Sequence, residues 1–117
     1  EGTVFSTFYD EAAPANDEAA AFVDGFKAYL TSIGESDIIP AVSALGYDAY
    51  ITAVQAIKDA DSVDPAAIKD ALKNVHVEGV TGDITFDENG DANKDMAYIK
   101  TIKDGKIVFL TTTSIDE

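Results

Sequence analysis

The chain has 117 residues, of which 46% are hydrophobic and 26% charged, and this is enough for one modest domain with a core. Twenty-two acidic and eight basic residues give a net charge of −14, which argues against nucleic acid or an anionic membrane surface as a partner, because Lys and Arg make those contacts. The absence of cysteine excludes disulfides, thiolate metal sites and cysteine nucleophiles.

The chain begins at Glu1 without a methionine and shows no signal peptide, so we expect a mature form or an excised piece. No apolar run approaches the roughly 20 residues that span a bilayer.

The first elements are predicted to be a strand and a helix. Residues 2–9 are rich in β-branched and aromatic side chains, which favours a strand, and residues 10–16 form a loop. Asn16 is a suitable helix cap, and Gly34 a suitable stop. Between them, apolar side chains recur at helical spacing: Phe22, Phe26, Tyr29, Leu30 and Ile33.

The middle of the chain is predicted to contain a short strand and two helices. The apolar residues 37–42 fit a buried strand, although Pro40 weakens this assignment. A helix then runs from Ser43 or Ala44 to about residue 60. Asp64-Pro65 is a helix start, with Asp at the cap and Pro in the first turn, and this helix ends near residue 74.

The last part of the chain is predicted to consist of strands. Residues 79–86 are interpreted as one strand, followed by a turn at 87–91. Residues 97–102 and 106–110 predict a hairpin that turns at Asp104-Gly105. The β-α-β order at the start of the chain favours an α/β architecture.

The common catalytic plans are not represented. His76 is the only histidine, so no histidine metal cluster or dyad can form. The sequence has no nucleophile elbow, no P-loop and no dinucleotide fingerprint. We therefore expect a protein that is not an enzyme and that needs no cofactor or metal.

Residues 87–91, Asp-Glu-Asn-Gly-Asp, place oxygen ligands at alternating positions, as calcium loops do. The EF-hand pattern fails, because Ala92 stands where glycine is needed and Tyr98 where the bidentate glutamate is needed. An acidic hairpin turn is the better interpretation.

Residues 44–49, Ala-Leu-Gly-Tyr-Asp-Ala, lie where the predicted buried strand passes into a helix. Ligands of open α/β sheets sit at such positions, where Gly46 allows close backbone approach and Tyr47 offers a ring and a hydroxyl. Ordinary packing at a helix start explains the same residues equally well.

Several segments resemble one family along essentially the whole chain. The segments that carry the resemblance are Tyr9-Asp10, Pro14-Ala15-Asn16, residues 44–49, Asp64-Pro65, and residues 79–91, Gly-Val-Thr-Gly-Asp-Ile-Thr-Phe-Asp-Glu-Asn-Gly-Asp. The family that they resemble is the branched-chain amino-acid-type solute-binding proteins of ABC transporters, which have the type I periplasmic binding protein fold.

The resemblance implies that residues 1–117 are the C-terminal portion of a two-lobe α/β protein, with three helices and about five to six strands here. Residues 12–92 would belong to the first lobe, and residues 1–11 and 93–117 to the hinge or the second lobe. Such a piece leaves strand edges unpaired, so we expect it to contact the rest of the parent protein or to self-associate with swapped strands.

The resemblance also implies a function outside the cytoplasm, in the periplasm or on the outer face of the cell membrane. A small solute, an amino acid or related carboxylate, would bind between the lobes and be presented to an ABC permease. Val42 and Ser43 would approach the ligand side chain and Tyr47 would close over it. Asp48 would either bind a cation or cap the helix, and the hinge aromatics Phe8 and Tyr9 would line the pocket.

Two alternatives remain open from the sequence. A ligand-sensing receptor domain reuses the same fold. A self-contained acidic protein-interaction domain is the other alternative, and it predicts a stable monomer without unpaired strand edges.

Overall fold

The computed structural model describes residues 1–94 and 96–114. The observed architecture is α/β with three helices and five strands, as the resemblance implied. The helices are α1 (Asp17–Ser32), α2 (Ala41–Ala60) and α3 (Pro65–Leu72). The strands are β1 (Val4–Thr7), β2 (Val77–Gly79), β3 (Gly82–Ile84), β4 (Met96–Lys103) and β5 (Lys106–Ser114).

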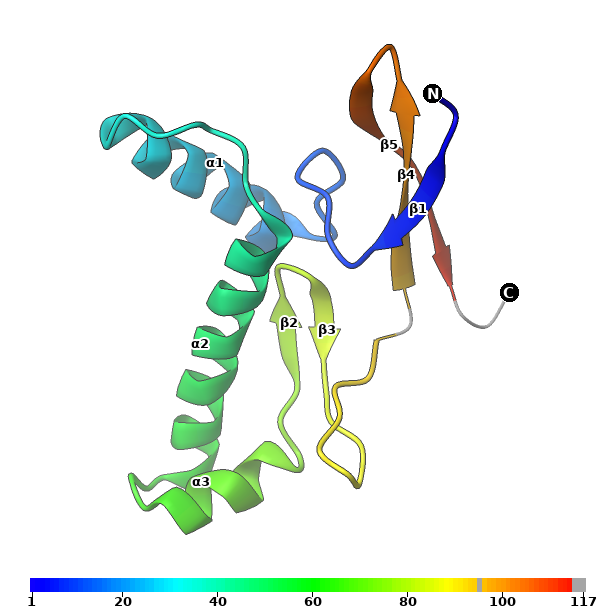
Figure 1. The fold of residues 1–117 in the computed structure, drawn as a ribbon. Coiled ribbons are helices and arrows are strands. Elements are labelled where there is room, and N and C mark those ends of the chain that lie inside the picture. Colours follow the sequence, from blue (N-terminus) through cyan, green and yellow to red (C-terminus); the bar gives the residue numbers. More distant parts are fainter. Residues whose placement is uncertain (95, 115–117) are drawn as a thin grey trace.

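The elements form two groups (Figure 1). One is a three-stranded antiparallel sheet in the order β1-β4-β5, and the other contains the three helices and the β2–β3 hairpin. The radius of gyration is 16.4 Å, whereas a compact domain of about 100 residues has about 13 Å. The described chain is therefore extended over two bodies that meet along a narrow junction.

The three-stranded sheet confirms the predicted C-terminal hairpin. β4 and β5 pair from Lys103↔Lys106 outward, and Asp104 and Gly105 turn the chain with φ of 52° and 71°. Two consecutive positive φ values match the turn that suits the twist of a two-residue hairpin. β1 pairs with the other side of β4, so β4 is the central strand.

Helices α1 and α3 begin as predicted. The Asn16 side chain accepts a hydrogen bond from Ala19 N, and the Asp64 side chain accepts from the backbone of Ala66 and Ala67. These caps satisfy N–H groups that have no partner within the helix. Helix α1 ends at Ser32, close to the predicted stop, and α3 ends at Leu72, earlier than predicted.

The predicted strand at residues 37–42 is wrong. Helix α2 begins at Ala41, directly after Pro40, whose φ of −63° and missing N–H suit the residue that precedes a helix. Ile39 is buried, but it lies in the core cluster and not in a sheet. The β-α-β order expected at the start does not form within the described residues.

The prediction of one strand over residues 79–86 is also wrong. The segment is a tight hairpin in which β2 and β3 pair across Val80 and Thr81. Gly82 has a φ of 97°, a conformation that favours glycine and reverses the chain. The turn predicted at residues 87–91 is confirmed, since Phe86 and Ala92 pair across it.

The core lies where the chain leaves β1 and meets both long helices. Its buried members come from the loop after β1, the segment before α2, both long helices and the hairpin turn: Tyr9, Ala19, Ile39, Ala44 and Val80. Partly buried aromatic side chains of α1 and α2 pack against it. This cluster is what joins the helical group to the chain from the sheet.

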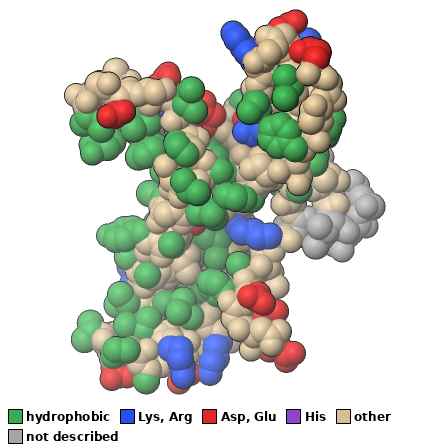
Figure 2. All heavy atoms as spheres, viewed as in Figure 1, with side chains coloured by type: hydrophobic (Ala, Val, Ile, Leu, Met, Phe, Trp, Pro, Cys, Tyr) green, Lys and Arg blue, Asp and Glu red, His purple; other side chains and the backbone are tan. Residues whose placement is uncertain are grey.

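Many large apolar side chains remain exposed, and Figure 2 shows them gathered along the helices. Val42 and Tyr50 of α2 are 69% and 68% exposed, and Ile38 before this helix is 69% exposed. No helix among the described residues has both the length and the apolar character needed to cross a membrane.

Candidate ligand-binding site

The first two turns of α2 carry three of the predicted ligand contacts. Val42 is exposed, while Ser43 and Tyr47 are half-buried. The Tyr47 ring packs against the Phe22 ring with centroids 5.0 Å apart, and its hydroxyl donates a 2.6 Å hydrogen bond to Glu18 Oε1. This hydrogen bond raises the pKa of Tyr47, so the hydroxyl stays protonated and is held by α1.

Asp48 has a role that the sequence did not suggest. It is buried, and its Oδ1 accepts from Val80 N at 2.6 Å while its Oδ2 accepts from Thr81 N and Thr81 Oγ1 at 2.9 and 2.6 Å. Gly79 completes the fit, because a Cβ there would lie 2.8 Å from Asp48 Oδ1. The carboxylate thus fastens the β2–β3 turn to α2 instead of capping its own helix.

The two hinge aromatics differ in environment. Phe8 is 38% exposed, whereas Tyr9 is 2% exposed and its hydroxyl has no hydrogen-bond partner among the described residues. Burial, helped by the nearby carboxylates of Glu11 and Asp10, raises the pKa of Tyr9 to about 12. The Tyr9 hydroxyl is therefore uncharged, and the side chain packs in the core as a largely apolar group.

The structure brings some of the predicted residues together. Tyr9 shares the core with Ala44, and Tyr47 packs against the same cluster. Asp48 reaches it through its hydrogen bond to Val80. Val42 remains exposed at the rim, and Phe8 lies on the sheet side of the junction.

A groove of about 770 Å³ opens between the sheet and the chain that enters α2. Its lining includes Tyr9 from the segment after β1, Ile39 and Ala41 around the start of α2, and Phe109 from β5. The groove also contains Lys100, whose Nζ lies 2.8 Å from Asp10 Oδ2. Sequence reasoning missed this pair, because its members are ninety positions apart and nothing local indicates the contact.

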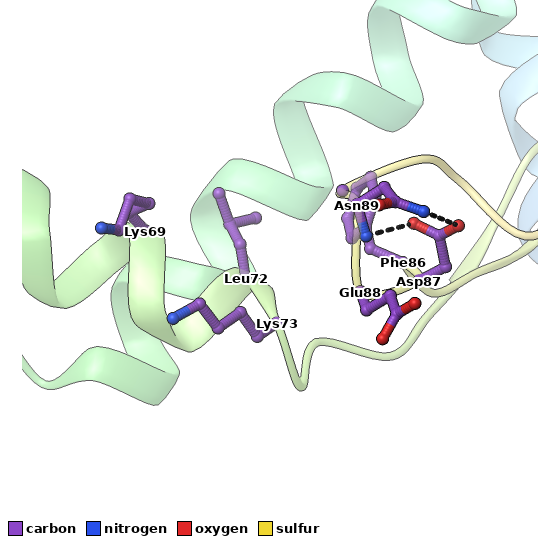
Figure 3. Close-up of a pocket in the computed structure, with 8 residues that line it drawn as sticks. Lys69, Leu72, Lys73, Phe86, Asp87, Glu88 and Asn89 are labelled. Atoms are coloured by element: carbon purple, nitrogen blue, oxygen red, sulfur yellow. Dashed lines mark hydrogen bonds between the residues drawn. The ribbon is translucent and has the colours of Figure 1, made fainter.

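The acidic turn at residues 87–91 faces α3 across a smaller pocket of 280 Å³, shown in Figure 3. Asp87 Oδ1 accepts hydrogen bonds from Asn89 N and Asp91 N, and these bonds, chiefly the one from Asp91, lower the pKa of Asp87. The carboxylate organises its own turn. Within residues 1–94 and 96–114 no group of three or more His, Cys, Asp or Glu side chains could hold a metal ion.

Comparison with known proteins gives consistent matches. Residues 1–106 match the family model described as periplasmic binding protein. A leucine-binding protein from Thermotoga maritima is 35% identical with a TM-score of 0.78, over 99% of this chain and 32% of that one. An ABC transporter substrate-binding protein from Desulfitobacterium hafniense, in complex with Leu, is 28% identical with a TM-score of 0.72, over 94% of this chain and 31% of that one.

The chain therefore spans about a third of the length of these two solved structures. The resemblance found in the sequence is confirmed by both the family match and the structural matches. The family match covers most of the chain, so this protein belongs to the periplasmic binding protein family.

Proposed function

We propose that the parent protein binds an amino acid or related carboxylate between two lobes, outside the cytoplasm, and presents it to an ABC permease. The observation that carries the proposal is the match at 35% identity, over 99% of this chain, to a leucine-binding protein. A binding protein of this kind has no catalytic role, and we propose none for this chain.

The division of the chain into lobes follows the two groups of elements. We assign residues 12–92 to the first lobe, and residues 1–11 and 93–117 to the hinge or the second lobe. The sheet and the helical group form separate bodies in Figure 1, and the chain passes between them after β1 and before β4, which supports this division.

The first turn of α2 is the part of this chain that we assign to the solute. Val42 offers an exposed apolar side chain next to Ser43, and Tyr47 stands one turn further along α2. An apolar surface with few polar groups suits the side chain of an aliphatic amino acid. Phe8 and Tyr9 complete the proposed site at the hinge.

The test is calorimetric titration of the full-length parent with single amino acids, leucine among them. We expect Val42→Asp to weaken the binding of an aliphatic amino acid at least about tenfold, because it places a charge in an apolar contact. Val63→Asp is the matched control, since Val63 is 86% exposed in the loop between α2 and α3. The proposal fails if no amino acid binds, and the site assignment fails if both variants bind equally well.

A further inference from the structure

Three consecutive residues join the two groups of elements. Tyr9, Asp10 and Glu11, here called the connector, leave β1 and lead toward α1. Tyr9 is buried among core residues of the helical group, including Ile39. Asp10 contacts the sheet through Lys100, and the connector therefore holds both bodies within three positions of chain.

The Asp10–Lys100 ion pair is the connector's link to the sheet. Lys100 Nζ lies 2.8 Å from Asp10 Oδ2, and the two side chains are 22% and 7% exposed. The other carboxylate oxygen accepts from Ala12 N at 2.8 Å, which turns the chain away from β1. A pair removed from water in this way is screened little by salt, and loss of one partner leaves a charge without compensation.

Lys100 occupies the centre of the sheet. It lies in β4 opposite Phe5 of β1 and Phe109 of β5. The β4–β5 register shifts between Ile99 and Lys100, so this position is the irregular point of the ladder, where the strand twist increases locally. A contact at this central position therefore acts on β4 and, through its pairing, on β1 and β5.

Glu11 links the connector to the helical group. Its Oε1 lies 3.1 Å from Lys27 Nζ in α1, and its Oε2 accepts from Ile39 N at 2.9 Å, just before α2 begins. Within the connector, Glu11 thus fixes the directions of α1 and α2, while the neighbouring Asp10 contacts β4. The groove of about 770 Å³ lies between these two sets of contacts.

We propose that Asp10 and Lys100 are positioning residues that set the angle between the three-stranded sheet and the helical group. The proposal rests on the proposed function, in which the angle between these bodies governs closure over the solute. Without the ion pair the two bodies sample a wider range of angles, and more conformational freedom is lost when the solute is trapped.

The test uses the full-length parent with spin labels on cysteines from Lys58→Cys in α2 and Lys103→Cys in β4. We expect Lys100→Met to broaden the label-to-label distance distribution and to raise the Kd for leucine about fivefold. Lys100→Arg keeps the charge and the reach, and it should restore both readouts. Lys73→Met is the matched control, because its ion pair with Asp70 has the same 2.8 Å distance but is exposed.

The two readouts separate this proposal from the proposed function. An unchanged distance distribution with a Kd within about twofold of wild type overturns it, even if Lys100→Met lowers the melting temperature. Broadening that Lys100→Arg reverses supports it, even in a parent that binds no amino acid. If Lys100→Met does not fold, Asp10→Asn removes the charge with little change of shape and gives the same readouts.

Discussion

Tyr9 is placed where a polar atom costs stability. Its hydroxyl has no hydrogen-bond partner among the described residues, and the side chain is packed against Ile39 and Ala44. Burying a hydroxyl without a partner costs about 1–3 kcal/mol by mutational measurements.

We expect Tyr9→Phe to raise the free energy of unfolding of the parent by about 1 kcal/mol at pH 7, since it removes a buried group without a partner. Urea denaturation of both proteins measures the difference. A loss of stability would instead show that the hydroxyl has a partner in the full-length protein.

The difference in stability between the wild type and Tyr9→Phe also depends on pH. The pKa of Tyr9 is raised from 10.0 to about 12, so the folded protein keeps a proton that the unfolded chain releases in this range. Relative to the Tyr9→Phe variant, the wild-type protein therefore loses stability as the pH rises from 10.0 through about 12. Subtracting the Tyr9→Phe curve from the wild-type curve isolates this contribution from that of Tyr98, whose pKa is also raised by burial.

At the scale of elements, the β2–β3 hairpin depends on a helix for its position. The two strands are only three residues each, too short to be stable alone. Asp48 of α2 supplies three hydrogen bonds to the turn, and Asn16 at the start of α1 donates to Gly79 O at 3.0 Å. The hairpin is therefore fastened to both long helices by charge-assisted and polar contacts.

We expect Asp48→Asn to destabilise the parent by about 2 kcal/mol, because the amide replaces one acceptor by a donor that faces a backbone or hydroxyl donor. Asp59→Asn is the matched control on the same helix, where the exposed carboxylate accepts only from the Gln55 side chain in the described structure. Equal denaturation midpoints for the two variants would contradict the role assigned to Asp48.

The elements that were predicted correctly carry their own stop and start signals. Asn16 and Asp64 cap α1 and α3, and Asp104-Gly105 makes a two-residue turn, all through contacts within a few positions of chain. The two errors arose where local pattern was ambiguous. Residues 37–42 are short and apolar, and such a run does not distinguish a buried strand from a buried loop. Residues 79–86 contain strand-favouring residues on both sides of Gly82, and a glycine inside such a segment fits a turn as well as an irregular strand.

At the scale of the whole molecule, the described chain leaves much of its surface without partners. β1 and β5 are the outer strands of the sheet, and Tyr50 and Ile107 are 68% and 64% exposed. Unpaired edges and exposed apolar side chains favour association with another chain.

We therefore expect the isolated 117-residue chain to form a dimer or a larger species in solution, and the full-length parent to be a monomer at the same concentration. Light scattering on a size-exclusion column measures both masses. A compact, stable monomer of the isolated chain would contradict the two-lobe assignment and favour a self-contained domain.

The sequence by itself determined the family, the α/β class, the caps of α1 and α3 and the C-terminal hairpin, because each depends on residues close together in the chain. It also predicted that residues 44–49 are helical, as they are in α2. Only the tertiary structure decided that Asp48 holds the hairpin turn, that Tyr9 is buried without a partner and that Asp10 meets Lys100. These contacts join residues 32 to 90 positions apart, and their energies depend on burial that no local pattern reveals.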